Sequence, residues 1–83
     1  MKLVFLGRFR ELAGARLSDV PLPAGVRTLQ GLQDWLARTE PDLAVALTGA
    51  RTQVAINQTL VRDPAYPIGD RDEIAFLPPM SGG

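Results

Sequence analysis

The sequence contains no cysteine and no histidine, and lysine occurs only once, as Lys2. The absence of these side chains excludes disulfides, cysteine nucleophiles, Ser-His triads and most transition-metal sites, so no metal site is expected. Nine basic and nine acidic residues give zero formal net charge, without the basic excess of a typical nucleic-acid-binding protein. No apolar run approaches the roughly 20 residues that span a bilayer. Neither a nucleic acid nor a membrane is therefore an expected partner.

What is present is enough for one small domain. The chain has 83 residues, of which 46% are hydrophobic, and this suffices for a single core. The apolar run at 3–6 is too short for a signal-peptide core and is interrupted by Gly7, so a cytoplasmic location is expected. We expect residues 1–77 to form the domain and residues 78–83 to form a flexible tail.

The first part of the chain has the pattern of a hairpin. Residues 3–9 carry apolar side chains on both faces of a predicted strand, and residues 10–14 form a short polar turn or one helical turn closed by glycine. A second strand is predicted over 17–22. Pro21 and Pro23 make it an edge strand or end it early, because proline cannot donate a hydrogen bond to a sheet.

The middle and the end of the chain predict helices followed by strands. Thr28 is a suitable N-cap for a helix over 28–38, in which leucines recur at helical spacing, and a short second helix follows over 42–48. Strands are predicted at 52–56 and 60–61, separated by an Asn-Gln turn, and the last strand is predicted at 73–77.

This order of elements predicts an α+β domain. One main helix is expected to lie across one face of a mixed sheet whose first and last strands, the most apolar ones, pair at its centre. The alternation of side chains assigns one common core to Leu3, Phe5, Leu29, Leu32, Leu36, Ile74 and Phe76.

The segment after the last strand is the most informative one for function. Pro78 and Pro79 stop the strand, and Met80, Ser81, Gly82 and Gly83 follow. Six extended residues reach roughly 20 Å, and glycine has no Cβ, so such an arm can enter a narrow channel in another protein. A terminal carboxylate delivered in this way can be activated there. The alternative is that the two glycines are only a frayed end or a cloning remnant.

Three motifs in order resemble the ubiquitin-like sulfur carriers, and among these the small subunits of molybdopterin synthase. They are 9–14 (FRELAG), 54–58 (VAINQ) and 72–83 (DEIAFLPPMSGG), of which the last is the most specific. One difference is visible, because the family usually has glycine where Arg71 stands. If that position requires a positive φ, Arg71 strains the turn or Gly69 takes over the role.

The resemblance implies both a fold and a mechanism. The family has the β-grasp fold of ubiquitin, and an ATP-dependent adenylyltransferase related to ubiquitin-activating enzymes activates the terminal glycine, here Gly83. Sulfur then converts it into a thiocarboxylate, and the large subunit of molybdopterin synthase accepts the tail, residues 78–82. Sulfur passes to a pterin precursor and forms the dithiolene of the molybdenum cofactor. The carrier itself is expected to bind no cofactor.

Strand alternation also predicts a partner surface. Leu6 and Leu77 alternate with the core residues Phe5 and Phe76, so they should lie on the open face of the sheet, where Leu60 can join them. The resemblance implies that these positions contact the large subunit. A small second core under the loops is the alternative.

Three other functions stay open at this point. The sulfur carrier of thiamin thiazole synthesis shares the diglycine end, although this chain differs in having a longer middle and two prolines before the tail. A ubiquitin-like modifier would join Gly83 to lysines of target proteins. A simple interaction domain would carry an inert tail.

Overall fold

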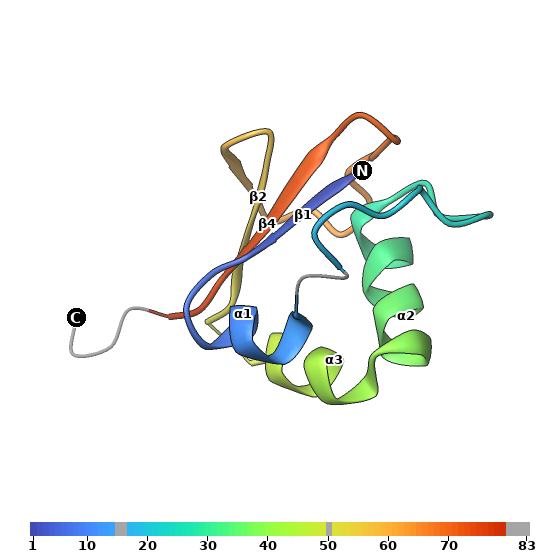
Figure 1. The fold of residues 1–83 in the computed structure, drawn as a ribbon. Helices are drawn as coiled ribbons and strands as arrows, with labels where there is room; N and C mark the ends of the chain where they lie inside the picture. The colour runs from blue at the N-terminus through green and yellow to red at the C-terminus, as the bar shows by residue number, and fades with distance from the viewer. Residues whose placement is uncertain (15–16, 50, 80–83) are drawn as a thin grey trace.

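The structure is a computed structural model that describes residues 1–14, 17–49 and 51–79. Its elements are β1 (Lys2–Phe5), α1 (Arg8–Ala13), α2 (Leu29–Thr39), α3 (Pro41–Leu47), β2 (Gln53–Ile56), β3 (Thr59–Val61) and β4 (Glu73–Leu77). The strands form one sheet in the order β1-β4-β2-β3, in which β1 is parallel to β4 and the other pairs are antiparallel. Figure 1 shows the three helices on one side of this sheet. The predicted α+β architecture with a mixed sheet is confirmed.

The core lies between the sheet and the helices. All seven residues that the sequence assigned to it are buried, and they form one cluster with further apolar residues from α1, α3 and β2. The rings of Phe5 on β1 and Phe76 on β4 stack on each other, with centroids 5.3 Å apart. Burying large aromatic and aliphatic side chains supplies most of the stability of such a small domain.

The two central helices begin where the sequence predicts. The hydroxyl of Thr28 accepts a hydrogen bond from the backbone N–H of Gly31 at 3.1 Å and caps α2. Pro41 is the first residue of α3, a position where its missing N–H leaves no partner unsatisfied. Leucines at helical spacing turn the buried side of α2 towards the sheet.

The predicted first strand is too long. β1 ends at Phe5, and the chain bends at Gly7, whose φ of +57° is rarely adopted by other residues. Helix α1 then begins at Arg8, and Phe9, predicted in the strand, is fully buried on the helix. Three helices therefore cover the sheet: the two predicted over 28–38 and 42–48, and α1. The helical turn closed by Gly14 is confirmed, since the Gly14 N–H donates to the carbonyl of Arg10.

The predicted strand over 17–22 is reduced to a single bridge between Lys2 and Asp19. Two backbone hydrogen bonds of 3.0 Å flank it, from Leu3 N–H to the Ser18 carbonyl and from Val20 N–H to the Met1 carbonyl. Pro21 has no N–H and cannot extend the ladder. The pairing of the first and last strands is confirmed, but of these two strands only β4 lies inside the sheet. In the four-stranded sheet of the described residues, β1 lies at the edge.

Two turns near the amino end of β4 are linked by side chains. Asn57 and Gln58 both adopt left-handed backbone conformations, with φ of 50° and 70°, as a tight hairpin turn requires. The side chain of Asn57 donates to Asp72 and accepts from the backbone N–H of Glu73, both at 2.9 Å.

The turn around Arg71 is not strained by that residue, because its φ is not positive. The Asp72 carboxylate accepts the Gly69 N–H at 2.7 Å and holds this turn instead. Gly69 does not take over the role either, since its φ also lies outside the left-handed region.

Candidate functional site

The tail begins at the end of the sheet where the chain leaves β1 and enters α1. Because β1 and β4 are parallel, their carboxyl ends lie side by side, and the Leu6 N–H donates to the Phe76 carbonyl at 3.1 Å (Figure 1). Pro78 and Pro79 follow β4 directly. The remaining residues predicted to act in the tail, Met80, Ser81, Gly82 and Gly83, lie outside the described residues.

Gly7 and Pro78 meet closely at this point. A Cβ added to Gly7 would lie 2.9 Å from Cγ of Pro78, which is too close for any larger residue unless the proline moves. Gly7 therefore combines two functions: its positive φ bends the chain, and its bare backbone makes room for the first proline of the tail. The sequence offered one signal for it, a glycine directly after an apolar run, but not the contact with Pro78.

The open face of the sheet is lined by small and apolar residues. The strand register aligns Val4, Ala75, Ala55 and Leu60 in one row across β1, β4, β2 and β3. Leu60 is 57% exposed, whereas the three other members of the row are partly buried. The two alanines leave the middle of this face shallow, so an apolar partner can approach the sheet closely.

The structure places all three residues of the predicted partner surface on or beside this face. Leu77 lies opposite Gln53 in the next row and is half-buried, and Leu6, directly after β1, is 42% exposed. We call this surface, made of Val4, Leu6, Ala55, Leu60, Ala75 and Leu77, the apolar face. The sequence missed its small residues, although the same alternation assigns them to it. That a partner binds there stays a prediction.

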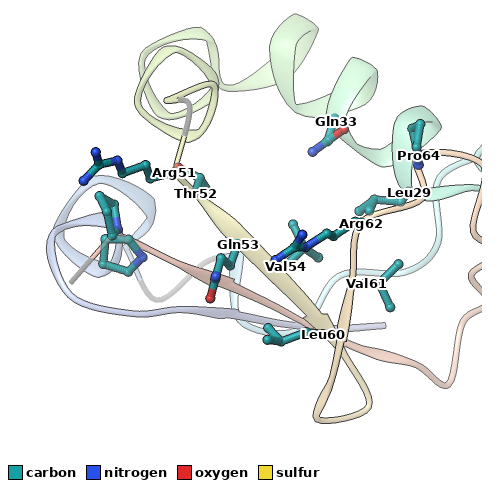
Figure 2. A pocket seen from close by; sticks show the side chains of 12 residues that line it. Leu29, Gln33, Arg51, Thr52, Gln53, Val54, Leu60, Val61, Arg62 and Pro64 are labelled. Carbon is teal, nitrogen blue, oxygen red and sulfur yellow. The ribbon is translucent and has the colours of Figure 1, made fainter. Parts of the chain in front are cut away.

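A groove adjoins the apolar face. It lies between the beginning of α2 and the β2–β3 edge, has a volume of about 690 Å³, and ends at Pro78 and Pro79. Figure 2 shows Arg62 reaching into it towards Val54 of β2, while Arg51 lies where β2 begins. The sequence analysis did not assign these two arginines to any site. They are separated by ten residues, and only the hairpin β2–β3 brings them to one groove.

Ionisable groups are paired at the opposite end of the sheet. The Asp70 carboxylate accepts the Leu22 N–H at 2.8 Å and lies 3.4 Å from the terminal ammonium of Met1. These two interactions, the first being the stronger, hold the pKa of Asp70 below its usual value. Lys2 pairs with Glu73 nearby at 3.6 Å. Both pairs fix the beginning of the sheet, away from the tail.

Metal-ligating side chains do not gather anywhere in the part of the chain that the structure describes. Nor is any helix there long and apolar enough to cross a membrane. What the described residues offer near the tail is a surface for binding: an apolar face, a groove with two arginines, and a fixed point from which the tail leaves.

Comparison with known proteins decides the family. The model of the ThiS family matches residues 3–83. The chain belongs to the ThiS family. Two curated relatives cover its whole length: the molybdopterin synthase sulfur carrier subunits of Escherichia coli (strain K12), 36% identical, and of Haemophilus influenzae, 34% identical, each aligned over 99% of its own length.

A solved structure confirms the fold of this ThiS family member. SAMP1 from Haloferax volcanii superposes with a TM-score of 0.77 at 25% identity, and the match covers 98% of this chain and 96% of that one. The fold is therefore the ubiquitin-like β-grasp that the sequence motifs implied. The resemblance to the molybdopterin synthase carriers is confirmed over the full chain.

Proposed function

We propose that this protein is the sulfur carrier subunit of a molybdopterin synthase. The observation that carries the proposal is the end-to-end similarity to two sulfur carrier subunits of that enzyme. The position of the tail supports it, because the tail starts at a rigid point beside an apolar surface. A carrier of this kind needs few reactive side chains, which agrees with a sequence that has neither cysteine nor histidine.

The reacting group is the carboxylate of Gly83. A partner adenylyltransferase uses ATP to join this carboxylate to AMP and releases pyrophosphate. A sulfur nucleophile then attacks the activated carbonyl carbon, AMP leaves, and one carboxylate oxygen has been exchanged for sulfur. The resulting thiocarboxylate is a sulfur nucleophile itself. In the synthase its sulfur bonds to a carbon of the pterin precursor, and water then cleaves the bond between this sulfur and the Gly83 carbonyl carbon, which returns the carboxylate. Each carrier delivers one sulfur, so the dithiolene requires two such transfers.

The division of labour follows from the surface. Residues 78–82 carry the reactive end into the active site of the large subunit, and the apolar face, with Leu6, Leu60 and Leu77, binds that subunit beside the entrance. The catalytic side chains come from the partner proteins, and this chain contributes the reactive carboxylate of Gly83. It binds no cofactor of its own and works in the cytoplasm.

Intact mass spectrometry after co-expression with the activating enzyme from the same organism tests the proposal. The wild type is expected to gain the mass difference between one sulfur and one oxygen. Three variants should fail: deletion of Gly83, addition of one residue after it, and Gly82→Val. An added residue moves the reactive carbon by about 3.5 Å, and errors of about 1 Å can reduce a rate roughly 100-fold.

Each alternative function predicts a different result in that experiment. A mass increase corresponding to a joined target protein, linked through lysine, would identify a modifier. Thiocarboxylate that supports thiazole formation but no dithiolene would identify the thiamin carrier. If the extended and truncated variants still form thiocarboxylate and product at the normal rate, with no protease restoring the end, the sulfur-carrier function is wrong.

A further inference from the structure

We propose that the groove between α2 and the β2–β3 edge binds an acidic segment of the synthase large subunit. The inference rests on the proposed function and adds a second contact, based on charge, to the apolar one. The groove is lined by residues of α2, β2 and β3, by Arg51 and Arg62, and by the two prolines that begin the tail. Its volume of about 690 Å³ has room for several side chains of a partner.

The charged side chains that line the groove are all positive. Among the described residues, Arg51 and Arg62 are the only charged ones that line it, although the chain as a whole is neutral. The ion pairs found among the described residues join Met1 to Asp70 and Lys2 to Glu73, so they use neither arginine. The two exposed guanidinium groups lie apart along the groove (Figure 2), and without carboxylates in the lining they are complementary to an extended acidic segment.

Nearby carboxylates are engaged elsewhere. Asp63 follows Arg62 in sequence, but it lies outside the lining, and its carboxylate accepts the Ala65 N–H at 2.9 Å. Asp34, one position after the lining residue Gln33, accepts a hydrogen bond from the Gln30 amide at 2.9 Å. Both carboxylates therefore accept hydrogen bonds from groups other than the two arginines.

Uncharged donors complete the surface. The Gln33 side chain is directed from α2 towards β2, and Gln53 lines the groove from β2 with its amide directed away from α2 (Figure 2). The hydroxyl of Thr52 is buried and has no hydrogen-bond partner among the described residues. Because this oxygen has no accessible surface, the polar contacts of the groove are left to the exposed donors.

The position of the groove identifies the partner. Leu60 belongs both to the apolar face and to the lining of the groove, and Pro78 and Pro79 close the groove where the tail begins. A protein that covers the apolar face and also takes up the tail must therefore pass beside Arg51 and Arg62. An acidic segment that runs along the groove can pass both arginines.

The lining favours a protein segment over a nucleic acid. Backbone binding to a nucleic acid neutralises several phosphates with a series of cations, whereas this groove offers two. Apolar residues such as Leu29, Val54 and Val61 make up much of the remaining wall. A segment that places carboxylates beside apolar side chains fits such a mixed wall.

The test measures binding of the full-length carrier to the large subunit from the same organism by titration calorimetry. The double variant Arg51→Glu/Arg62→Glu is compared with the control Arg38→Glu/Arg71→Glu, which changes the net charge equally at two exposed positions outside the groove. We expect the groove variant to bind about 30-fold more weakly at roughly 0.05 M salt, and the difference to shrink near 0.5 M as charges are screened. The control should change binding by less than about threefold.

A charge exchange locates the segment. Acidic residues of the large subunit are replaced by lysine one short segment at a time, and one such variant should restore binding of the groove variant while weakening binding of the wild type. Equal weakening by the groove variant and the control, or a groove effect that salt leaves unchanged, would overturn the inference. Normal binding of the groove variant to the large subunit, with a loss only at the activating enzyme or on nucleic acid, would overturn it as well. Failure of the wild type to bind the large subunit would instead contradict the proposed function.

Discussion

The two faces of the sheet come from the same strands but have opposite roles. Phe5 and Phe76 point to the helices and are buried, whereas Leu77 at the end of β4 and Leu6 directly after β1 lie on or beside the face without helices. Strand geometry forces this separation, because successive side chains point to opposite sides. Buried residues on one side stabilise the fold, so residues on the other side are available for partners. Stability and binding can therefore be changed separately.

The largest effect is expected from the helix-facing side. Phe76→Ala removes a fully buried ring that stacks on Phe5, and leaves a cavity between sheet and helices. We expect a loss of about 3–5 kcal/mol in the free energy of unfolding, measured by urea denaturation. Leu60→Ala, on the exposed face, serves as the control and should change stability by less than about 0.5 kcal/mol. Equal losses in the two variants would contradict the assignment of the faces.

The open face should affect binding without unfolding the protein. Leu6→Asp places a charge on the apolar face, and loss of such an anchor weakens association by about 2 kcal/mol, or roughly 30-fold in Kd. The matched Leu77→Asp variant is expected to act in the same direction. Binding to the large subunit by calorimetry, with circular dichroism as a check of folding, measures the effect.

An exposed residue of the other layer is the control for these variants. Val45 on α3 is 74% exposed but lies on a helix, so Val45→Asp should leave binding unchanged. If Leu6→Asp binds as well as wild type, the apolar face is not the interface. If it unfolds the domain, Leu6 belongs to the core.

Gly7 connects the two faces to the tail. Gly7→Ala should lower stability by about 1–2 kcal/mol because of its positive φ, and should also displace Pro78, so that thiocarboxylate forms more slowly. Gly14→Ala is the matched control, since Gly14 also has a positive φ but nothing lies within 4 Å of an added Cβ. Melting curves and the rate of thiocarboxylate formation separate the two effects. A similar slowing in both variants would show that the contact with Pro78 is unimportant.

The smallest effect is expected at the end of the sheet opposite the tail. The Asp70 pKa is lowered in the folded protein, so its interactions stabilise the fold above the pKa of the unfolded chain, and this stability is lost as the pH falls through the folded pKa. Asp70→Asn keeps an oxygen for the Leu22 N–H but removes the charge beside Met1.

We therefore expect a slight decrease in melting temperature at pH 7, because the Asp70 side chain is largely exposed and solvent screens the pair. The difference from wild type should disappear in acid, below the folded pKa. Asp63→Asn, which removes a carboxylate elsewhere on the surface, controls for the change in net charge. A difference that persists unchanged in acid would mean that Asp70 acts through something other than its charge.

Local patterns were sufficient for much of the fold. The bounds of β4 follow from alternation and the cap of α2 at Thr28 from a hydroxyl before a leucine repeat, and α3 begins at Pro41, one residue before the predicted position. Two predictions failed where local patterns compete. Phe9 continues an apolar run as a strand residue would, but the bend at Gly7 places it on a helix.

The other failure concerns residues 17–22. Their composition suits a strand, but Pro21 limits the pairing to the bridge at Asp19, and the first strand remains at the edge of the described sheet. A segment forms a strand only if a neighbouring strand offers it enough hydrogen bonds. That number depends on the arrangement of the whole sheet and cannot be read from one segment of sequence.

The sequence by itself determined the family, the alternation that separates core from open face, and the motif 72–83 that points to carrier chemistry. Only the tertiary structure decided that Pro78 rests on Gly7 and that Arg51 and Arg62 share a groove beside Leu60. The physical reason is the distance along the sequence between the residues that interact. Alternation, capping and turn formation depend on residues a few positions apart, whereas contacts between distant segments follow from strand order and register, which are fixed when the whole core packs.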